Sequence, residues 1–210
     1  MSLVDNVHDY ILTNTNSNIV LLKNKEVLMW LFKDHSFLPS IERKSKTRDQ
    51  IELKKLEDAW GQATLKARRP DLTLDGQWTN KFGEILCEEI FMLLGKSVYK
   101  PLIKNNLQPD METDENIVEA KICTFYTTGT ANEKIMGVPF KYADVPLLYK
   151  KPLIIFCMGG AEWICREQYG VFAGNKCSPT KQRILDFYRN ELNITFMSAT
   201  TVLSGLVVTD

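Results

Sequence analysis

The chain has 210 residues, of which 44% are hydrophobic and 25% charged, a composition that excludes disorder as its main state. Its 26 Lys and Arg residues balance its 26 Asp and Glu residues. This balance excludes binding of a polyanionic partner through the bulk positive charge of the whole chain. Any nucleic-acid surface must therefore be a local patch. The length predicts one large domain or a core with a helical appendage.

Membrane, secretion and zinc signals are lacking from the sequence. Apolar stretches such as residues 152–158 are far shorter than the roughly 20 residues of a membrane helix, so we expect a soluble protein. The first ten residues have no secretory pattern, which predicts a cytoplasmic location. The five cysteines form no CxxC spacing and are expected to be reduced and buried: Cys87, Cys123, Cys157, Cys165 and Cys177.

The first third of the chain has the period of helices. From Val4 to about Lys66 the apolar residues recur at helical spacing, and no stretch alternates like a strand. We therefore predict a helical N-terminal region over residues 1–78. Within it, residues 43–69 hold nine Lys or Arg against four Asp or Glu. This local excess of positive charge fits a solvated helix face, and it also fits a surface that faces phosphates.

The middle region begins with a helix that carries acidic residues. Thr79 or Asn80 is a candidate N-cap, apolar residues follow on one stripe, and Gly95 is a C-terminal stop. Glu84 and Glu88 are four residues apart, so they share one face of this helix. Two carboxylates on one partly apolar face are unusual.

After this helix the hydrophobic period changes to that of strands. Strands are expected at 98–103, around Asp110, at 117–124, 153–158 and 193–199, with a loop and helix over 129–149 and an amphipathic helix over 181–192. The run 153–158 is apolar throughout, which indicates burial on both faces. The sequence thus predicts an α/β fold: a central mixed β-sheet flanked by helices over residues 79–210, with the helical region 1–78 packed on it in one compact domain.

The most informative pattern joins Asp110 to the strand that carries Glu119 and Lys121. Successive side chains of a strand point to opposite faces, so Glu119 and Lys121 share one face while Ala120 points into the core. If the intervening turn has an even number of residues, such as 113–116, Asp110 falls opposite Glu119 with about 5 Å between Cβ atoms. An ordinary amphipathic edge strand would also accommodate these residues.

Two carboxylates at this distance repel each other and raise one pKa unless a cation lies between them. A divalent metal resolves the conflict, and a few hard oxygen ligands with retained waters are typical of Mg²⁺ acting on phosphate. Lys121 would then orient or help to deprotonate the attacking water and screen the phosphate. The residues predict a Mg²⁺ site at Asp110 and Glu119, with Lys121 beside it.

With Pro109-Asp110, Glu119-Ala120-Lys121 and the helix around Phe82-Gly83-Glu84, the sequence resembles the PD-(D/E)XK nuclease superfamily, and within it the type II restriction endonucleases. The resemblance covers residues 79–158. It implies a restriction-endonuclease-like core and Mg²⁺-dependent hydrolysis of phosphodiester bonds in double-stranded DNA at a specific short sequence. A homodimer is expected because one active site per chain must serve each strand.

The resemblance also implies roles for individual residues. Asp110, Glu119 and the backbone carbonyl of Ala120 correspond to metal ligands, and a carboxylate from the preceding helix joins the site. Glu84 is the first candidate for that carboxylate and Glu88 the second, because Glu84 lies nearer the helix start. A second Pro-Asp pair at residues 70–71 precedes the long helix, so it cannot form the hairpin and is expected to lie outside the site.

Residues 127–135 resemble, loosely, a segment that follows the catalytic strand in some restriction enzymes. Small hydroxyl residues and a glycine at this place let a backbone approach a phosphate closely. Thr128, Thr130, Lys134 and Lys141 are therefore candidates for DNA binding, although a solvated loop has the same composition. The two lysines would share a helix face only if the helix ran unbroken, which the glycine and proline between them oppose.

Three classes of function remain open at this stage. The first is the sequence-specific endonuclease, and the second is a structure-specific DNA repair nuclease or junction resolvase with the same site. The third is a non-catalytic DNA- or protein-binding domain in which Asp110, Glu119 and Lys121 merely pair at a surface. The lack of a helicase, P-loop or zinc motif favours a self-contained nuclease.

Overall fold

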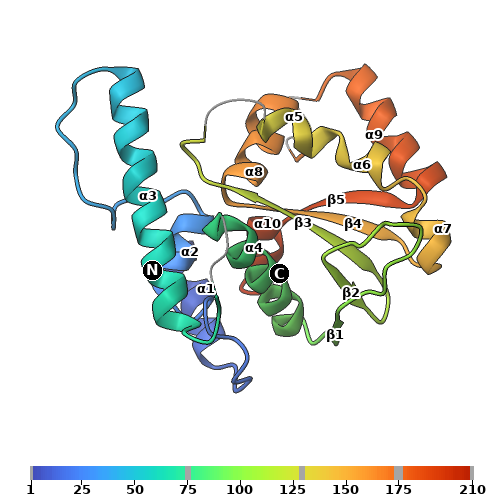
Figure 1. Cartoon of the computed structure of the whole chain (residues 1–210), viewed down its shortest axis with the longest axis horizontal. Coiled ribbons are helices and arrows are strands. Elements are labelled where there is room, and N and C mark those ends of the chain that lie inside the picture. The colour runs from blue at the N-terminus through green and yellow to red at the C-terminus, as the bar shows by residue number, and fades with distance from the viewer. Residues whose placement is uncertain (1, 74–76, 128–130, 173–176, 209–210) are drawn as a thin grey trace.

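A computed structural model of the protein describes residues 2–73, 77–127, 131–172 and 177–208 (Figure 1). These residues form an α/β fold with a five-stranded mixed sheet, helices on its flanks and further helices at the N-terminus. The predicted fold class is confirmed in these general terms. No helix in the described ranges is long and apolar enough to cross a membrane.

The helices and strands follow one another in this order: α1 (Leu3–Leu12), α2 (Lys25–Leu31), α3 (Lys46–Arg68), α4 (Trp78–Leu93), β1 (Val98–Tyr99), β2 (Met111–Thr113), β3 (Ile117–Cys123), α5 (Ala131–Met136), α6 (Val138–Lys141), α7 (Val145–Tyr149), β4 (Leu153–Met158), α8 (Gly159–Ile164), the π-helix η1 (Cys165–Tyr169), α9 (Pro179–Leu192), β5 (Ile194–Ser198) and α10 (Ala199–Gly205).

The sheet combines an antiparallel and a parallel half in the order β1-β2-β3-β4-β5. Strands β1 to β3 pair antiparallel, and β3 to β5 pair parallel. Met111 pairs with Val118, and the turn over residues 113–116 closes with a backbone hydrogen bond of 2.8 Å from its first residue to its last. The even-numbered turn is therefore confirmed, and the same register puts Asp110 opposite Glu119.

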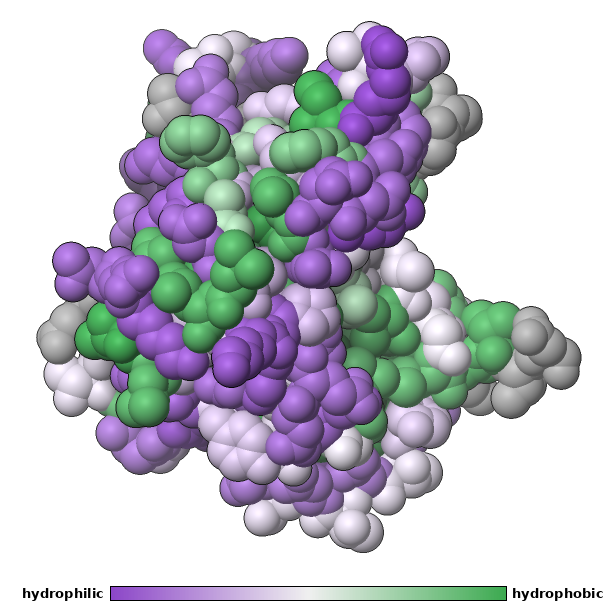
Figure 2. All heavy atoms as spheres, turned by 90° about the vertical axis from the view of Figure 1, so that its right-hand side faces the viewer, coloured by the Kyte–Doolittle hydropathy of each residue, from purple (hydrophilic) through white to green (hydrophobic). Residues whose placement is uncertain are grey.

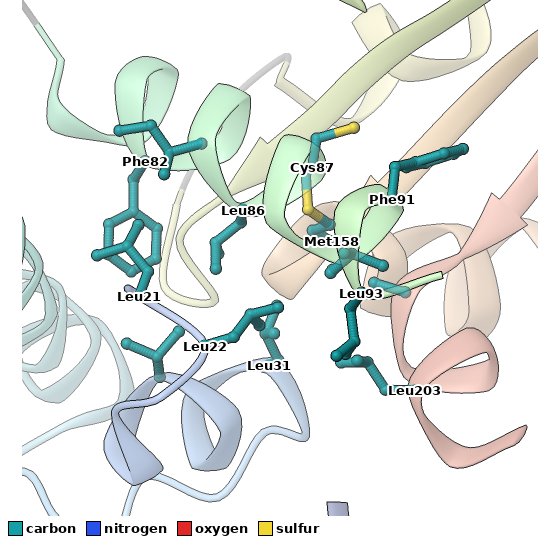
Figure 3. Close-up of a cluster of buried hydrophobic side chains, with 14 of the residues drawn as sticks. Leu21, Leu22, Leu31, Phe82, Leu86, Cys87, Phe91, Leu93, Met158 and Leu203 are labelled. Atoms are coloured by element: carbon teal, nitrogen blue, oxygen red, sulfur yellow. The ribbon is translucent and has the colours of Figure 1, made fainter. Parts of the chain in front are cut away.

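Strand β4 is buried along its whole length because it lies between β3 and β5 under helices on both faces. Its even-numbered residues join a hydrophobic cluster with α1, α2, α4 and α10, and its odd-numbered residues join a second cluster with the segment from α5 to η1. Figure 3 shows part of the first cluster, where side chains of α4 lie close to those of the N-terminal segment, β4 and α10. The N-terminal helices thus share a core with the sheet.

Helix α3 is fastened to the end of β3 by a buried acid. The indole N–H of Trp30 donates to Oε1 of Glu57 at 2.6 Å, and the backbone N–H of Phe125 donates to the same oxygen at 3.0 Å. Burial raises the pKa of Glu57, and these hydrogen bonds oppose that rise. Because the loop after β3 and α3 share this carboxylate, α3 is held at a fixed place beside the carboxyl end of the strand.

Two predicted boundaries are wrong. The strand expected at 98–103 is only Val98–Tyr99, and Pro101 has no N–H with which to continue the ladder. Helix α4 begins at Trp78, after Gln77 with no side-chain cap, so neither Thr79 nor Asn80 is the N-cap. The indole N–H of Trp78 donates to Asp58 of α3 at 3.0 Å, a tertiary contact at the helix start.

The expected end of α4 is confirmed, and the expectation for the cysteines is confirmed only in part. Gly95 follows α4 with a φ of 74°, the left-handed conformation that ends a helix and favours glycine. All five cysteines are free; Cys87, Cys157 and Cys165 are buried, whereas Cys123 and Cys177 are partly exposed, contrary to the expectation that all are buried. Figure 2 views the side opposite α3, where apolar side chains gather in patches between polar ones.

Candidate active site

A cleft of about 990 Å³ opens beside the carboxyl half of β3. Figure 1 shows α3 on one side of this region and α5 on the other, with β3 and the start of α4 between them. The charged residues that line the cleft come from all of these elements and from the residue before β2: Lys54, Asp58, Glu84, Asp110, Lys121 and Lys134. The structure thus brings five predicted site residues into the lining of one cavity, namely Glu84, Asp110, Ala120, Lys121 and Lys134, and leaves the predicted ligand Glu119 outside that lining.

Asp110 is held against β3 by the backbone. Its Oδ2 accepts a hydrogen bond of 2.8 Å from the N–H of Ala120. Burial, followed by the negative charge of Glu119, raises the pKa of Asp110 to about 6, while Lys121 and the Ala120 N–H act in the opposite direction. The two facing carboxylates therefore repel each other across the strand pair, as their register predicts.

Lys121 supplies the positive charge nearest to Glu119. Its Nζ donates to Oε1 of Glu119 at 2.6 Å and to the carbonyl oxygen of Ala120 at 3.0 Å. Glu119 is buried, and its Oε2 has no hydrogen-bond partner within 3.5 Å among the described residues, although a side-chain interaction with Glu119 contributes to the raised pKa of the Tyr142 hydroxyl. The ammonium therefore binds the same carboxylate and carbonyl that the family resemblance assigns to a metal ion.

These donors fit a hard divalent cation. A buried carboxylate oxygen without a partner, a second carboxylate whose pKa is raised, and a carbonyl oxygen that already binds a cation are oxygen ligands of the kind that Mg²⁺ takes. Within the described ranges no group of three or more His, Cys, Asp or Glu side chains gathers as a metal centre. Asp110, Glu119 and Ala120 would hold Mg²⁺ with water completing its coordination.

Gly83 lets α4 approach β3 at this point. A Cβ atom on Gly83 would lie only 2.4 Å from Cγ2 of Ile122, so a larger residue does not fit here without displacement. The close approach brings Glu84 into the cleft lining, where it pairs with Lys81 at 2.6 Å. Glu88 does not line the cleft, and burial, followed by the charge of Glu84, raises its pKa.

Of the four candidates for DNA binding, the structure describes Lys134 and Lys141. Lys134 is exposed on α5 and lines the cleft, and Lys141 is exposed at the end of α6. The break between α5 and α6 is as expected, so the two lysines do not lie on one continuous helix. Thr128 and Thr130 lie outside the described residues.

Sequence reasoning missed Tyr142 as a neighbour of the site. Its ring is buried in the second hydrophobic cluster, and its hydroxyl accepts a hydrogen bond of 3.1 Å from Nζ of Lys141. Burial, followed by the charge of Glu119, raises the pKa of the phenol. No local pattern marks Tyr142, because only the fold of α6 back onto β3 brings it near.

The Pro-Asp pair at residues 70–71 lies outside the site, as predicted. Asp71 is exposed and forms two hydrogen bonds with Arg69, at 2.9 and 2.7 Å. Neither Asp71 nor Arg69 lines the cleft.

No protein-family model, curated protein or solved structure matches the chain. The chemistry of the site therefore has to be inferred from its own residues. Asp110, Ala120 and Lys121 line the cleft together with the basic residues Lys54 and Lys134, whereas Glu119 is buried beside Lys121 and is not part of the lining. Such a constellation is suited to binding a phosphate ester and stabilising the charge that develops when water attacks it.

Proposed function

We propose that the protein is a Mg²⁺-dependent type II restriction endonuclease that hydrolyses phosphodiester bonds of double-stranded DNA at a specific short sequence. One observation carries the proposal: Lys121 is hydrogen-bonded to both Glu119 and the Ala120 carbonyl, and the strand register puts Glu119 opposite Asp110. A PD-(D/E)XK nuclease needs these groups together at one end of a strand. The same chemistry favours a homodimer, because two strands require two such sites.

In this proposal each residue has a defined task. Bound Mg²⁺ supplies Lewis-acid stabilisation of the phosphate and lowers the pKa of a coordinated water. Asp110, Glu119 and the Ala120 carbonyl hold the cation, and the buried setting of Glu119 keeps its carboxylate oriented. Lys121, released from Glu119, turns its ammonium toward the attacking water and the scissile phosphate. Glu84 lines the cleft, where its carboxylate can accept a hydrogen bond from a water molecule.

The test is to incubate the purified chain with unmethylated plasmid DNA and Mg²⁺ and to sequence the resulting ends. We expect discrete fragments whose ends share one short sequence. Cleavage of four-way junctions or flaps in preference to intact duplex would replace the restriction enzyme by a structure-specific nuclease. No cleavage of any DNA with Mg²⁺ or Mn²⁺ would contradict both nuclease proposals.

A further inference from the structure

Helix α3 has one buried and one exposed side. Its buried residues, Glu57, Gly61, Thr64 and Leu65, face the body of the protein. At about 1.5 Å per residue, its 23 residues span about 34 Å, close to one turn of B-form DNA. The exposed side is therefore long enough to follow a duplex over a full helical turn.

Three basic residues form a row along the exposed side. Arg48, Lys55 and Lys66 are separated by seven and eleven residues, which are whole numbers of helical turns to within about 20°. All three are exposed, and none forms an ion pair with another described residue. We call these three residues the basic row of α3; it extends over about 27 Å at the helical rise per residue.

Most acidic residues of α3 already form hydrogen bonds or ion pairs within the protein. Glu57 binds Trp30 and the loop after β3, and Asp58 binds Lys54 at 2.6 Å as well as the indole of Trp78. Asp49 accepts backbone N–H groups at the start of the helix. Glu52 is the remaining acid of α3 and is exposed beside the basic row. Glu52 lies four residues after Arg48 and three before Lys55, which is the spacing at which helix charges pair, yet it forms no ion pair with either residue.

The cleft lies next to the basic row near Lys66. Gln62, about one helical turn before Lys66, lines the cavity that contains Asp110 and Lys121, and Lys54 of the same helix lines it as well. Lys134 lines the cavity from α5. A strand whose scissile phosphate lies at Lys121 would thus leave the cleft alongside α3.

We propose that the basic row of α3 binds the phosphate backbone of the DNA duplex that flanks the cleft; this rests on the proposed function. Charge complementarity selects the partner, because a duplex carries one negative charge per about 1.7 Å of its axis and the row offers unpaired cations over about 27 Å. Phosphates rather than base edges are the target, since phosphate contacts position a duplex without carrying sequence information. The row therefore contributes affinity and register, and leaves sequence reading to other residues.

The test measures binding of the full chain to fluorescent duplex DNA in EDTA, where no cleavage occurs, over a series of salt concentrations. One variant combines Arg48→Gln, Lys55→Gln and Lys66→Gln. The matched control removes the same charge from an exposed helix on the far side of the protein by Lys181→Gln, Arg183→Gln and Arg189→Gln. Circular dichroism and thermal melting confirm that both variants are folded.

We expect the α3 variant to bind at least tenfold more weakly, both on the sequence that the plasmid-cleavage experiment identifies and on unrelated duplexes. The slope of log K against log salt should become shallower by about 0.9 for each lost phosphate contact, or about 2.7 in all. The α9 control should bind like the wild type. An unchanged slope, an equal loss in the control, or a loss confined to one sequence would overturn the assignment of α3.

Failure of this inference and failure of the proposed function give different results. If the wild type cleaves DNA and the α3 variant binds like it, only the assignment of α3 is wrong. If the wild type neither binds nor cleaves duplex DNA, the proposed function is wrong and the basic row has no DNA to contact.

Discussion

Lys121 and Glu119 form an ion pair in which Nζ lies 2.6 Å from Oε1, while the second oxygen of the same carboxylate has no partner among the described residues. A buried carboxylate with a hydrogen bond to only one of its oxygens lowers the stability of the folded state, because the other oxygen has lost its water and gained no partner. A Mg²⁺ ion bound at Oε2, as the proposed function requires, would remove this cost. The Lys121–Glu119 ion pair therefore affects both the stability of β3 and the proposed binding of a metal ion.

Replacing Lys121 by alanine should separate chemistry from binding. We expect Lys121→Ala to lower the cleavage rate at least 100-fold, since the ammonium acts on water and phosphate. Binding to duplex DNA in EDTA should change less than threefold. Without metal the variant should also lose about 1–3 kcal/mol of unfolding free energy, because Glu119 is left unpaired, and Mg²⁺ should restore part of it. Equal losses of binding and cleavage would indicate a structural ion pair instead.

The raised pKa of Asp110 predicts a variant that is more stable than the wild type. The pKa of about 6 in the folded protein exceeds the ordinary value of 3.8, so the fold favours the protonated acid. Its stabilising contribution is fully present below pH 3.8 and is lost as the pH rises through about 6.

Asp110→Asn keeps the hydrogen bond to the Ala120 N–H and removes the charge. Without metal at pH 7.5, we expect it to raise the unfolding free energy by up to about 3 kcal/mol and to abolish cleavage. The gain should shrink as the pH falls from 7 to 5, as measured by denaturant melts at each pH. A loss of stability at pH 7.5 would show that Asp110 is not destabilised by charge.

The two acids of α4 can be compared directly. Gln replaces Glu at similar size and helix propensity, so Glu84→Gln and Glu88→Gln should both fold normally. Only Glu84 lines the cleft, so we expect Glu84→Gln to lower the cleavage rate at least tenfold and Glu88→Gln to lower it less than threefold. A larger loss in Glu88→Gln would transfer the role to that residue. If neither rate changes, α4 is only a scaffold.

Substitution of Gly83 tests whether the close contact between α4 and β3 is needed for stability and activity. The added methyl of Gly83→Ala would meet Ile122, so we expect a cost of about 1–3 kcal/mol in stability together with lower activity. Gly137→Ala is the control, since its Cβ meets its nearest neighbour at an ordinary 3.6 Å. Adding Ile122→Ala should cost less in the Gly83→Ala background than alone, because the methyl then has room. An additive double-mutant cycle would contradict the close contact.

Much of the site could be predicted from local pattern. The alternation along β3 is a backbone property, and the even-numbered turn over residues 113–116 fixed which residue faces Glu119. Gly95 likewise ended α4 where its conformational freedom was needed. In each case the signal lies within a few residues of the feature that it determines.

Other features depend on contacts between distant segments. The apolar residues at 19–22 have helical spacing, yet the N–H groups of Leu21 and Leu22 donate to the buried Glu89 at 2.9 and 2.8 Å in a non-helical segment. The start of α4 at Trp78 and the proximity of Tyr142 to Glu119 likewise follow from tertiary packing. Spacing in the sequence carries no information on such pairs.

Cleavage of supercoiled plasmid DNA by the wild type and by Glu119→Gln, each with Mg²⁺ and with EDTA, tests the central claim most directly. The substitution keeps the size of the buried side chain and removes the charge that would hold the metal. We predict discrete fragments from the wild type with Mg²⁺ and none in EDTA or from the folded variant. Cleavage that persists in EDTA, or that Glu119→Gln performs at the wild-type rate, would contradict a metal-dependent site at Asp110, Glu119 and Lys121.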